Sequence, residues 1–314
     1  MVEGNKIKGL GVIFLFAFGI IIFVGFASAG IGDWFKSLTG KATSQNFGVN
    51  VSVGNNAPNI TFVSPLGNIN VNEDNVVNIQ LNFTAYDADG SGNLVSTSGK
   101  ANFTRGSEAV RANSSCVQLN TFSNYYANYT CTIAMWYYDG AGEWNITTYV
   151  ADISGAAIMN TTTKFTLNEL AAFKSSPSLL TFSSLNPGSV NQTASNDPLL
   201  MNNTGNKAII AGNIEINATD LKGETDNTRA IYAGNISIGV STGGTPPAEC
   251  SGTSMNSSLS IPIGSATLPK GNYTVNDGST GQEQLYFCIK KAGSELTTQA
   301  YSTSQMGLWT VKIA

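Results

Sequence analysis

A run of mostly apolar, uncharged residues at positions 10–29 constrains this chain more than any other feature. In a helix, about 20 such residues rise roughly 30 Å, which matches the hydrocarbon core of a bilayer. Lys6 and Lys8 precede the run and favour a cytoplasmic location for that side. We therefore expect residues 10–29 to contact the membrane and the rest of the chain to be exported and to fold outside it.

The fate of this run has three interpretations. Ala27-Ser28-Ala29 matches the small-residue pattern of signal-peptide cleavage, which would leave Gly30 as the first residue. The run is longer than the roughly 7–15 apolar residues of a signal-peptide core, which favours a retained membrane anchor instead. Lys8-Gly9 before the run resembles the cleavage site of archaeal type IV prepilins, a family whose apolar helix remains and packs in the filament core.

The remaining composition is typical of an all-β protein with short antiparallel strands. Asn, Ser, Thr and Gly are abundant, and 42% of the chain is hydrophobic, which is enough for two cores. Residues 76–86 alternate apolar and polar with a period of two, which predicts a half-buried strand. We expect further strands over 60–63, 129–137, 144–150 and 161–167, with a hairpin turn at 139–142, and over 179–182, 208–216, 235–240, 284–289 and 309–313.

These patterns predict two antiparallel β-sandwich domains after an N-terminal hydrophobic helix. We place a signal peptide or anchor helix at 1–29, a polar tether at 30–56, a first sandwich at 57–169, a linker at 170–178 and a second sandwich at 179–314.

Charge and residue usage narrow the function classes. Only 11% of the residues are charged, the net charge is −4 and no basic patch follows the leader, so we expect no nucleic-acid partner. The absence of histidine excludes Ser-His-Asp machinery and histidine-ligated zinc. Asp139, Glu143, Glu224 and Asp226 are the acids that a hydrolase would pair, but no pattern brings two of them together, so we predict no enzyme activity.

The cysteines and the glycosylation sequons indicate the same compartment. The four cysteines suggest disulfides in an exported chain, and their spacing favours Cys116–Cys131 and Cys250–Cys288; four free buried thiols are the alternative. Asn-x-Ser/Thr occurs about twice as often as the composition predicts, and some acceptors should fall in buried strands. The acceptors are Asn50, Asn59, Asn82, Asn102, Asn113, Asn128, Asn145, Asn160, Asn191, Asn202, Asn217, Asn235, Asn256 and Asn272.

The sharpest chemical motif runs from Asp87 to Asn93. Asp87 and Asp89 alternate before a glycine turn, and Asn93 adds an amide oxygen, which suits a hard cation such as calcium. The segment matches the first half of an EF-hand loop, but Ser98 stands where the closing Glu should be. The alternative is an ordinary acidic turn after a strand.

Several segments carry a family resemblance. Asn59-Ile60-Thr61-Phe62, Asn72-Glu73-Asp74, residues 85–90, residues 142–146 and Ala151-Asp152 resemble tandem immunoglobulin-like and cadherin-like modules of prokaryotic, archaeal-type surface proteins. The resemblance implies an Ig-like sandwich over 57–169. It also implies that distant acids complete a calcium site, for which Glu73, Asp74 and Asp152 are the candidates. The cysteine–tryptophan pattern of antibody domains is not met, because Trp136 follows both Cys116 and Cys131.

Two groups of aromatic residues are candidate contact surfaces. Tyr125-Tyr126 lies between the first two cysteines, in a loop that a disulfide would close. A second group could stack on sugars or belong to the core, and it comprises Trp136, Tyr137, Tyr138, Trp144 and Tyr149.

We therefore expect an exported cell-surface glycoprotein with a structural or adhesive role. Its partners would be other surface proteins or glycans, with self-association through sheet edges. A pilin-like filament subunit and a carbohydrate- or solute-binding ectodomain are the alternatives.

Overall fold

The computed structural model describes residues 48–242 and 246–314. The hydrophobic run lies outside these residues, so its conformation and its fate stay predictions. Asn55 to Ala314 form one compact unit, and residues 48–54 are exposed and lack secondary structure. In the described part of the chain, no helix is long and apolar enough to cross a membrane. The helical segments there are short 3-10 turns: η1 (Ser91–Asn93), η2 (Ala233–Asn235) and η3 (Ala248–Cys250).

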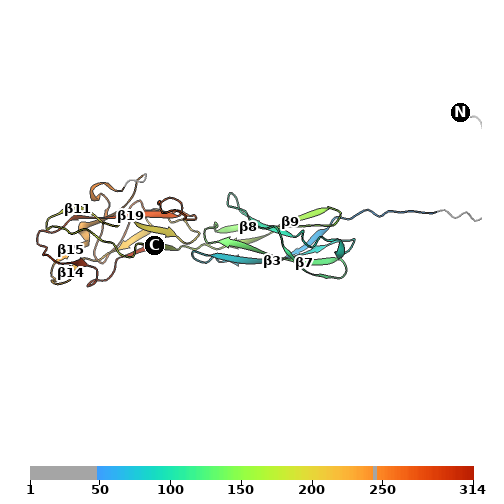
Figure 1. Cartoon of the computed structure of the whole chain (residues 1–314), viewed down its shortest axis with the longest axis horizontal. Helices are drawn as coiled ribbons and strands as arrows, with labels where there is room; N and C mark the ends of the chain where they lie inside the picture. Colours follow the sequence, from blue (N-terminus) through green and yellow to red (C-terminus); the bar gives the residue numbers. More distant parts are fainter. Residues whose placement is uncertain (1–47, 243–245) are drawn as a thin grey trace, which may run out of the picture. The chain divides into compact units, whose positions relative to one another are not determined.

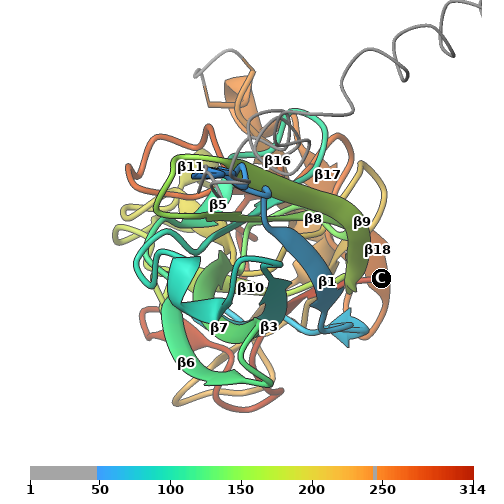
Figure 2. The same ribbon diagram turned by 90° about the vertical axis from the view of Figure 1, so that its right-hand side faces the viewer.

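Sheet 1 is antiparallel and has the strand order β1-β3-β7-β6. The predicted alternation of residues 76–86 is confirmed: Ile79, Leu81, Phe83 and Ala85 are buried, whereas the polar residues between them are exposed or half-buried. Figure 2 shows β6 beside β7 at the margin of the sheet. The strands are β1 (Asn59–Val63), β3 (Val76–Tyr86), β6 (Val117–Phe122) and β7 (Tyr126–Trp136).

Sheet 2 has the strand order β2-β9-β8-β4-β5, and only its β2–β9 pair is parallel. The predicted hairpin at 139–142 is wrong, because β7 pairs within sheet 1 and β8 pairs within sheet 2. The turn between them therefore carries the chain from one sheet to the other. The strands are β2 (Asn68–Ile69), β4 (Lys100–Thr104), β5 (Arg111–Asn113), β8 (Gly142–Ala151) and β9 (Ala157–Leu167).

One hydrophobic cluster, the first core, includes inward residues of both sheets. Its largest fully buried side chains include Trp144, Tyr129, Phe83 and Phe103. The predicted Cys116–Cys131 disulfide is confirmed, and it fastens the segment before β6 to β7. The shared cluster and the covalent tie explain how so polar a sequence forms a hydrophobic core here.

The chain after residue 170 builds a second core from three further groups of strands (Figure 1). Their orders are β10-β12-β19-β16-β17 with β11 also on β19, β18-β13-β21, and β15-β14-β20. The predicted Cys250–Cys288 disulfide is confirmed and joins η3 to β19. The strands are β10 (Phe173–Ser176), β11 (Val190–Thr193), β12 (Leu199–Asn203), β13 (Ile214–Asn217), β14 (Leu221–Gly223), β15 (Ala230–Ile231), β16 (Ile236–Val240), β17 (Thr253–Ser254), β18 (Ser260–Pro262), β19 (Gln282–Lys291), β20 (Tyr301–Ser302) and β21 (Thr310–Ile313).

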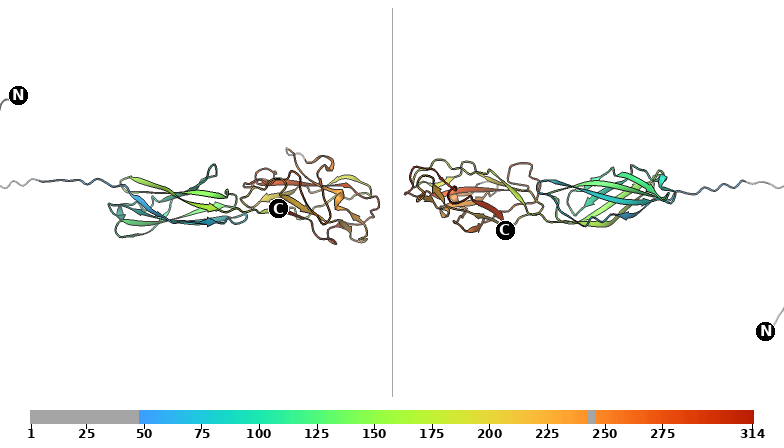
Figure 3. Two further views of the ribbon diagram at one scale, coloured as in Figure 1. Left: turned by 180° about the vertical axis from the view of Figure 1, so that it is seen from behind. Right: turned by 90° about the horizontal axis from the view of Figure 1, so that it is seen from below.

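The predicted strands are less accurate in this region. The strand predicted at 179–182 is replaced by an irregular segment with one bridge from Phe182 to Ala194, and the strand predicted at 208–216 is reduced to β13. β16, β19 and β21 lie where the alternation predicted strands. In Figure 3 the blue-to-green strands and the yellow-to-red strands form two groups, in line with the two separate cores.

The predicted linker at 170–178 contains a strand. β10 pairs with β12, and just before it the Leu170 N–H donates to Asn206 Oδ1 at 2.7 Å. Asn206 Nδ2 in turn donates to the Asn168 carbonyl at 2.9 Å. The buried amide of Asn206 thus fixes the backbone where the chain passes from the first core to the second.

Candidate functional site

Four segments meet at the end of the first core where β3 finishes. The loop at 87–93 follows β3, and the loop at 123–125 joins β6 to β7. Asp87 N–H donates to the Tyr125 carbonyl at 2.9 Å, and Ser91 N–H donates to the Asn124 carbonyl at 2.7 Å. Ile153 N–H donates to the Asn93 carbonyl at 2.8 Å, which brings in the turn after β8. Asn55 and Asn56 reach the same place from the N-terminal side.

The polar residues here form what we call the acid–amide cluster. It consists of Asp87, Asp89, Asn93 and Asp152, with Asn55 and Asn56. Asn93 Nδ2 donates to Asp87 Oδ2 at 3.3 Å and to Asn55 Oδ1 at 3.1 Å. Asn55 Nδ2 donates to Asp152 Oδ2 at 2.7 Å, so two asparagines bridge two carboxylates. Asn56 binds Asp89 through both its backbone and its side-chain nitrogens.

The burial of the two bridged carboxylates is unusual for charged groups. Asp87 is 0% exposed and Asp152 is 2% exposed. In the described residues neither belongs to an ion pair, and amide N–H groups provide the compensation. The Asn55 hydrogen bond, followed by backbone N–H groups such as that of Ala156, lowers the pKa of Asp152. Asp152 therefore stays ionised under neutral conditions.

The structure separates the six predicted calcium ligands into two sets. Asp87, Asp89, Asn93 and Asp152 come together, but Glu73 and Asp74 precede β3 while Asp87 follows it. At about 3.3 Å per residue, this strand holds the two ends roughly 35 Å apart. The geometry therefore does not place Glu73 and Asp74 in the same site.

Glu73 and Asp74 bind elsewhere. Glu73 Oε1 accepts from Thr204 Oγ1 at 2.8 Å. Asp74 accepts from Lys174 Nζ at 2.7 Å and from the Tyr273 hydroxyl at 2.5 Å. These bonds to Lys174, then to Tyr273, lower the pKa of Asp74.

The remaining set is a partial match to calcium chemistry. Carboxylate and amide oxygens are the ligands of a hard cation, and Asp87, Asp152, Asn55 and Asn93 supply both types. Among residues 48–242 and 246–314, however, no three Asp, Glu, His or Cys side chains are grouped closely enough to hold a metal. Any cation here would rely on amide oxygens, which requires the asparagine side chains to turn.

An exposed aromatic cluster lies beside these residues. It consists of Tyr86 at the end of β3, Phe122 at the end of β6, Tyr125 in the loop and Tyr126 at the start of β7. The Phe122 and Tyr126 rings stack with centroids 5.1 Å apart and planes 12° apart. Tyr86 lies 5.0 Å from Tyr126 and 6.1 Å from Tyr125. Phe122 is 42% exposed and Tyr125 is 46% exposed, so part of this flat apolar surface contacts water.

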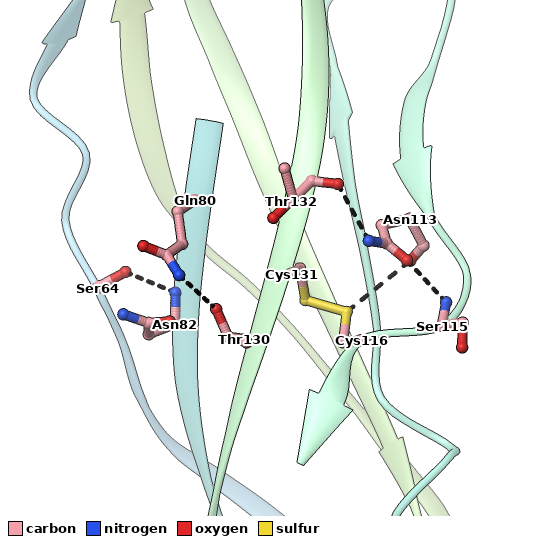
Figure 4. The surroundings of a disulfide bond; sticks show 9 residues. All are labelled: Ser64, Gln80, Asn82, Asn113, Ser115, Cys116, Thr130, Cys131 and Thr132. Carbon is pink, nitrogen blue, oxygen red and sulfur yellow. Dashed lines mark hydrogen bonds between the residues drawn. A yellow bond between two sulfur atoms is a disulfide. The ribbon is translucent and has the colours of Figure 1, made fainter. Parts of the chain in front are cut away.

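The outer face of sheet 1 continues from these rings as a network of neutral polar groups. Thr84 Oγ1 donates to Asn128 Oδ1 at 2.8 Å, and Asn128 Nδ2 donates to Asn120 Oδ1 at 3.1 Å. Farther along, Gln80 Nε2 donates to Thr130 Oγ1 at 3.2 Å (Figure 4). The four strands of sheet 1 contain no charged residue. Aromatic rings and amides therefore dominate this face without ionic groups.

The sequence identified half of the aromatic cluster. Tyr125 and Tyr126 were candidates, but Tyr86 and Phe122 were not. Both end a strand on its polar face, which is the signal that would have identified them. The second predicted group is split: Trp144 and Tyr137 are buried, whereas Trp136 is partly exposed and stacks on Tyr138 at 5.9 Å.

The candidate hydrolase acids are held by separate partners. Asp139 binds Arg111, and Glu143 binds Lys164. Asp226 accepts from Thr228, and Glu224 accepts from Ser302 and Ser304. The hydrogen bonds from Ser302 and Ser304 lower the pKa of Glu224. Among the described residues, no contact joins two of these four acids.

Several sequons lie in strands whose alternate residues are buried, but the asparagine side chains themselves are not buried. In the described chain all fourteen are exposed or half-buried. The sequon spacing of two equals the period of a strand, so the Asn and the Ser or Thr share the outer face while the middle residue points inward. Those middle residues are buried in five sequons that lie within strands: Ile60, Phe83, Phe103, Tyr129 and Ile146. Strand alternation thus accounts for part of the sequon excess.

A small cavity of about 240 Å³ lies beside the Cys250–Cys288 disulfide. Asp197 lines it and accepts the Phe287 N–H at 3.0 Å. Burial raises the pKa of Asp197 to about 6.

Comparison with known proteins assigns no family to the chain: no family model matches the sequence, and no curated protein shows significant similarity to it.

Proposed function

We propose that the chain is an exported cell-surface protein with a structural or adhesive role, which presents two β-sandwich modules outside the membrane. Three observations support export: the apolar run at 10–29, the two disulfides, and sequon asparagines that are nowhere buried in the described residues. Disulfides persist in oxidising extracytoplasmic compartments. The tandem Ig-like and cadherin-like resemblance agrees with such a role.

The aromatic cluster carries the adhesive part of this proposal. Aromatic rings are among the most frequent anchors of contact surfaces, because they bury much apolar area with few rotatable bonds. Here four rings cover one end of an uncharged sheet, beside loops that are joined by the Asp87 N–H···Tyr125 and Ser91 N–H···Asn124 backbone hydrogen bonds. A contact through this end would use rigid elements rather than mobile side chains.

A carbohydrate-binding ectodomain is the second candidate, and the neutral amide network favours it. Sugar rings present apolar faces and many hydroxyl groups, which stacked rings and amides can satisfy together. The ladder of Thr84, Asn128 and Asn120 begins next to Tyr126. The calcium proposal belongs to the same end of the molecule, with Asp87, Asp89, Asn93 and Asp152 as ligands.

The test compares Phe122→Ala and Tyr125→Ala variants of the full chain, displayed on cells or in nanodiscs. We expect each to reduce attachment to envelope material at least several-fold. Tyr232→Ala is the matched control, because Tyr232 is exposed but belongs to the second group of strands. Attachment that survives both cluster variants, or that falls equally in the control, would refute a role for this surface. Saturable binding of isolated envelope glycans with quenched aromatic fluorescence would select the carbohydrate-binding candidate.

The pilin-like alternative differs from the other two in which peptide bond near the N-terminus is cleaved. Mass spectrometry of the mature N-terminus decides it: a start at Leu10 supports a pilin, a start at Gly30 supports secretion, and an intact leader supports a tether.

A further inference from the structure

The segment Val49–Val53 has the composition of a strand but no strand partner in the described residues. Val49, Val51 and Val53 are 73%, 76% and 85% exposed. They alternate with Asn50 and Ser52, so an extended backbone would place the three valines on one face. Valine is among the strongest strand formers, and no residue from 48 to 54 is charged. An apolar stripe of this kind gains stability by adding to a sheet.

β6 provides a suitable edge. It lies at the margin of sheet 1 and pairs only with β7 in the structure (Figure 2). Val117 and Leu119 are 61% and 58% exposed. A register shift at Leu119 interrupts the pairing with β7, but no lysine or proline protects the strand. Natural edge strands usually carry such protection against pairing with other chains.

The other edges of the described sheets are shorter or protected. β5, β10 and β21 each contain a basic residue, and β18 ends in proline. β2, β15, β17 and β20 have two residues each. β1 contacts β8 and β9 of sheet 2, and β11 has only four residues. At six residues, β6 is the longest edge without a charge or a proline.

We propose that Val49–Val53 of one copy adds as a strand to β6 of a second copy. The added strand would place its valines beside Val117 and Leu119, and backbone hydrogen bonds would give the affinity. Donor and acceptor are different surfaces, so each copy keeps one of each after pairing. Such head-to-tail contacts extend into a chain of copies unless the rotation closes a ring. The acceptor strand ends at Phe122, which also belongs to the aromatic cluster, but the residues that carry this inference, Val49–Val53, Val117 and Leu119, lie outside that cluster.

Membrane attachment would assist this contact. Ordering five residues opposes pairing, so isolated copies should associate weakly. Copies held in one membrane have a high effective concentration, which compensates for weak individual contacts.

The experiment uses two full-length variants, each defective in one half of the contact. Val51→Pro disables the donor, because proline removes a backbone N–H and restricts the segment. Leu119→Lys protects the acceptor edge. Val275→Lys is the control, at an exposed valine outside both elements. Sedimentation in detergent and hydrogen exchange at β6 are measured over a range of protein concentrations.

We expect wild type and Val275→Lys to form oligomers, with protection of β6 that increases with concentration. Each single variant should weaken assembly about tenfold or more. A mixture of the two variants should form dimers but no longer species, because only one donor and one acceptor remain competent. Folding of each variant is verified by near-ultraviolet circular dichroism.

Three results would overturn the proposal. The first is assembly that persists in both single variants, since residues 10–29 are unchanged in them and would then drive it. The second is β6 protection that does not depend on concentration, which indicates pairing within one copy. The third is wild type that stays monomeric with an unprotected β6 at the highest concentration reached.

Discussion

We expect the Arg111→Ala substitution to destabilise the first core strongly. Arg111 lies on β5, and its guanidinium grips the carboxylate of Asp139 in the turn between the two sheets. Nε lies 3.0 Å from both carboxylate oxygens, and a second nitrogen lies 2.5 Å from Oδ1. Asp139 is only 1% exposed, and it also accepts the Trp136 N–H at 2.7 Å. The pair therefore connects β5, β7 and the turn that leads to β8.

The magnitude follows from what remains after Arg111→Ala. Asp139 keeps the Trp136 hydrogen bond but loses its only described cation, and breaking a buried pair from one side costs about 3–5 kcal/mol. The Arg111 side chain is 17% exposed, so water can relieve part of that loss and the lower end applies. Its contact over the Tyr138 ring, at 5.6 Å, contributes about 0.5–1 kcal/mol more. We expect a loss of about 3.5–4 kcal/mol in total.

Guanidinium unfolding monitored by tryptophan fluorescence measures this loss, because Trp144 is fully buried in the first core. Arg111→Lys should recover only part of the stability, since an ammonium cannot form the bidentate hydrogen bonds that a guanidinium makes to both carboxylate oxygens. Lys164→Ala is the control: it removes the exposed Lys164–Glu143 pair and should cost less than about 1 kcal/mol. A loss below about 1 kcal/mol for Arg111→Ala would show that the buried pair does not stabilise this turn.

Two further predictions concern the acids. Calcium at about 100 times its dissociation constant should stabilise the fold by roughly 2.7 kcal/mol if the acid–amide cluster binds it. We expect calcium to raise the melting temperature of wild type but not of Asp87→Asn, and equal melting in calcium and chelator would reject the site. The raised pKa of Asp197, about 6 against an unfolded value of 3.8, means that the folded state holds its proton more tightly. Protonated Asp197 therefore stabilises the fold at pH values below the unfolded pKa. This contribution to the free energy of unfolding, roughly 1 kcal/mol after allowance for solvent screening, is lost as the pH rises through about 6. The Asp197→Asn substitution should make the free energy of unfolding less dependent on pH between these two values. An unchanged pH dependence would show that the Asp197 carboxyl does not have a raised pKa in the folded state.

The sequence predicted the strands whose alternation crosses a dry core. β3 was placed correctly because every second residue from Ile79 to Ala85 is buried, and a shift of one residue would expose them all. Both disulfides followed from spacing. The turn at 139–142 was misassigned because Asp and Gly serve tight hairpins and sheet-to-sheet crossovers equally well. Only long-range partners distinguish the two, and Arg111 is 28 residues from Asp139.

The candidate site shows the same limit. Asp87, Asp89 and Asn93 were found because they are close in the sequence, and Asp152 followed from the family resemblance. Glu73 and Asp74 could have been excluded from the sequence, because an intervening eleven-residue strand separates them from Asp87. Asn55 and Asn56 could not have been found, since nothing in a polar segment marks which amide will bridge a distant carboxylate.

Ion pairs contribute to contacts within the chain, whereas the surfaces that we propose for attachment and assembly contain no charged residue. The segments before and after residue 170 are joined by ion pairs from Lys174 to Asp74, Lys207 to Glu169 and Lys270 to Glu108. Sheet 1 and residues 48–54 contain no charge at all. Salt screens partly exposed ion pairs but leaves apolar burial intact or strengthens it. Raising ionic strength should therefore increase hydrogen exchange around the ion pairs while attachment and assembly persist. Attachment or assembly that falls steeply with salt would mean that charged residues outside sheet 1 carry the contact.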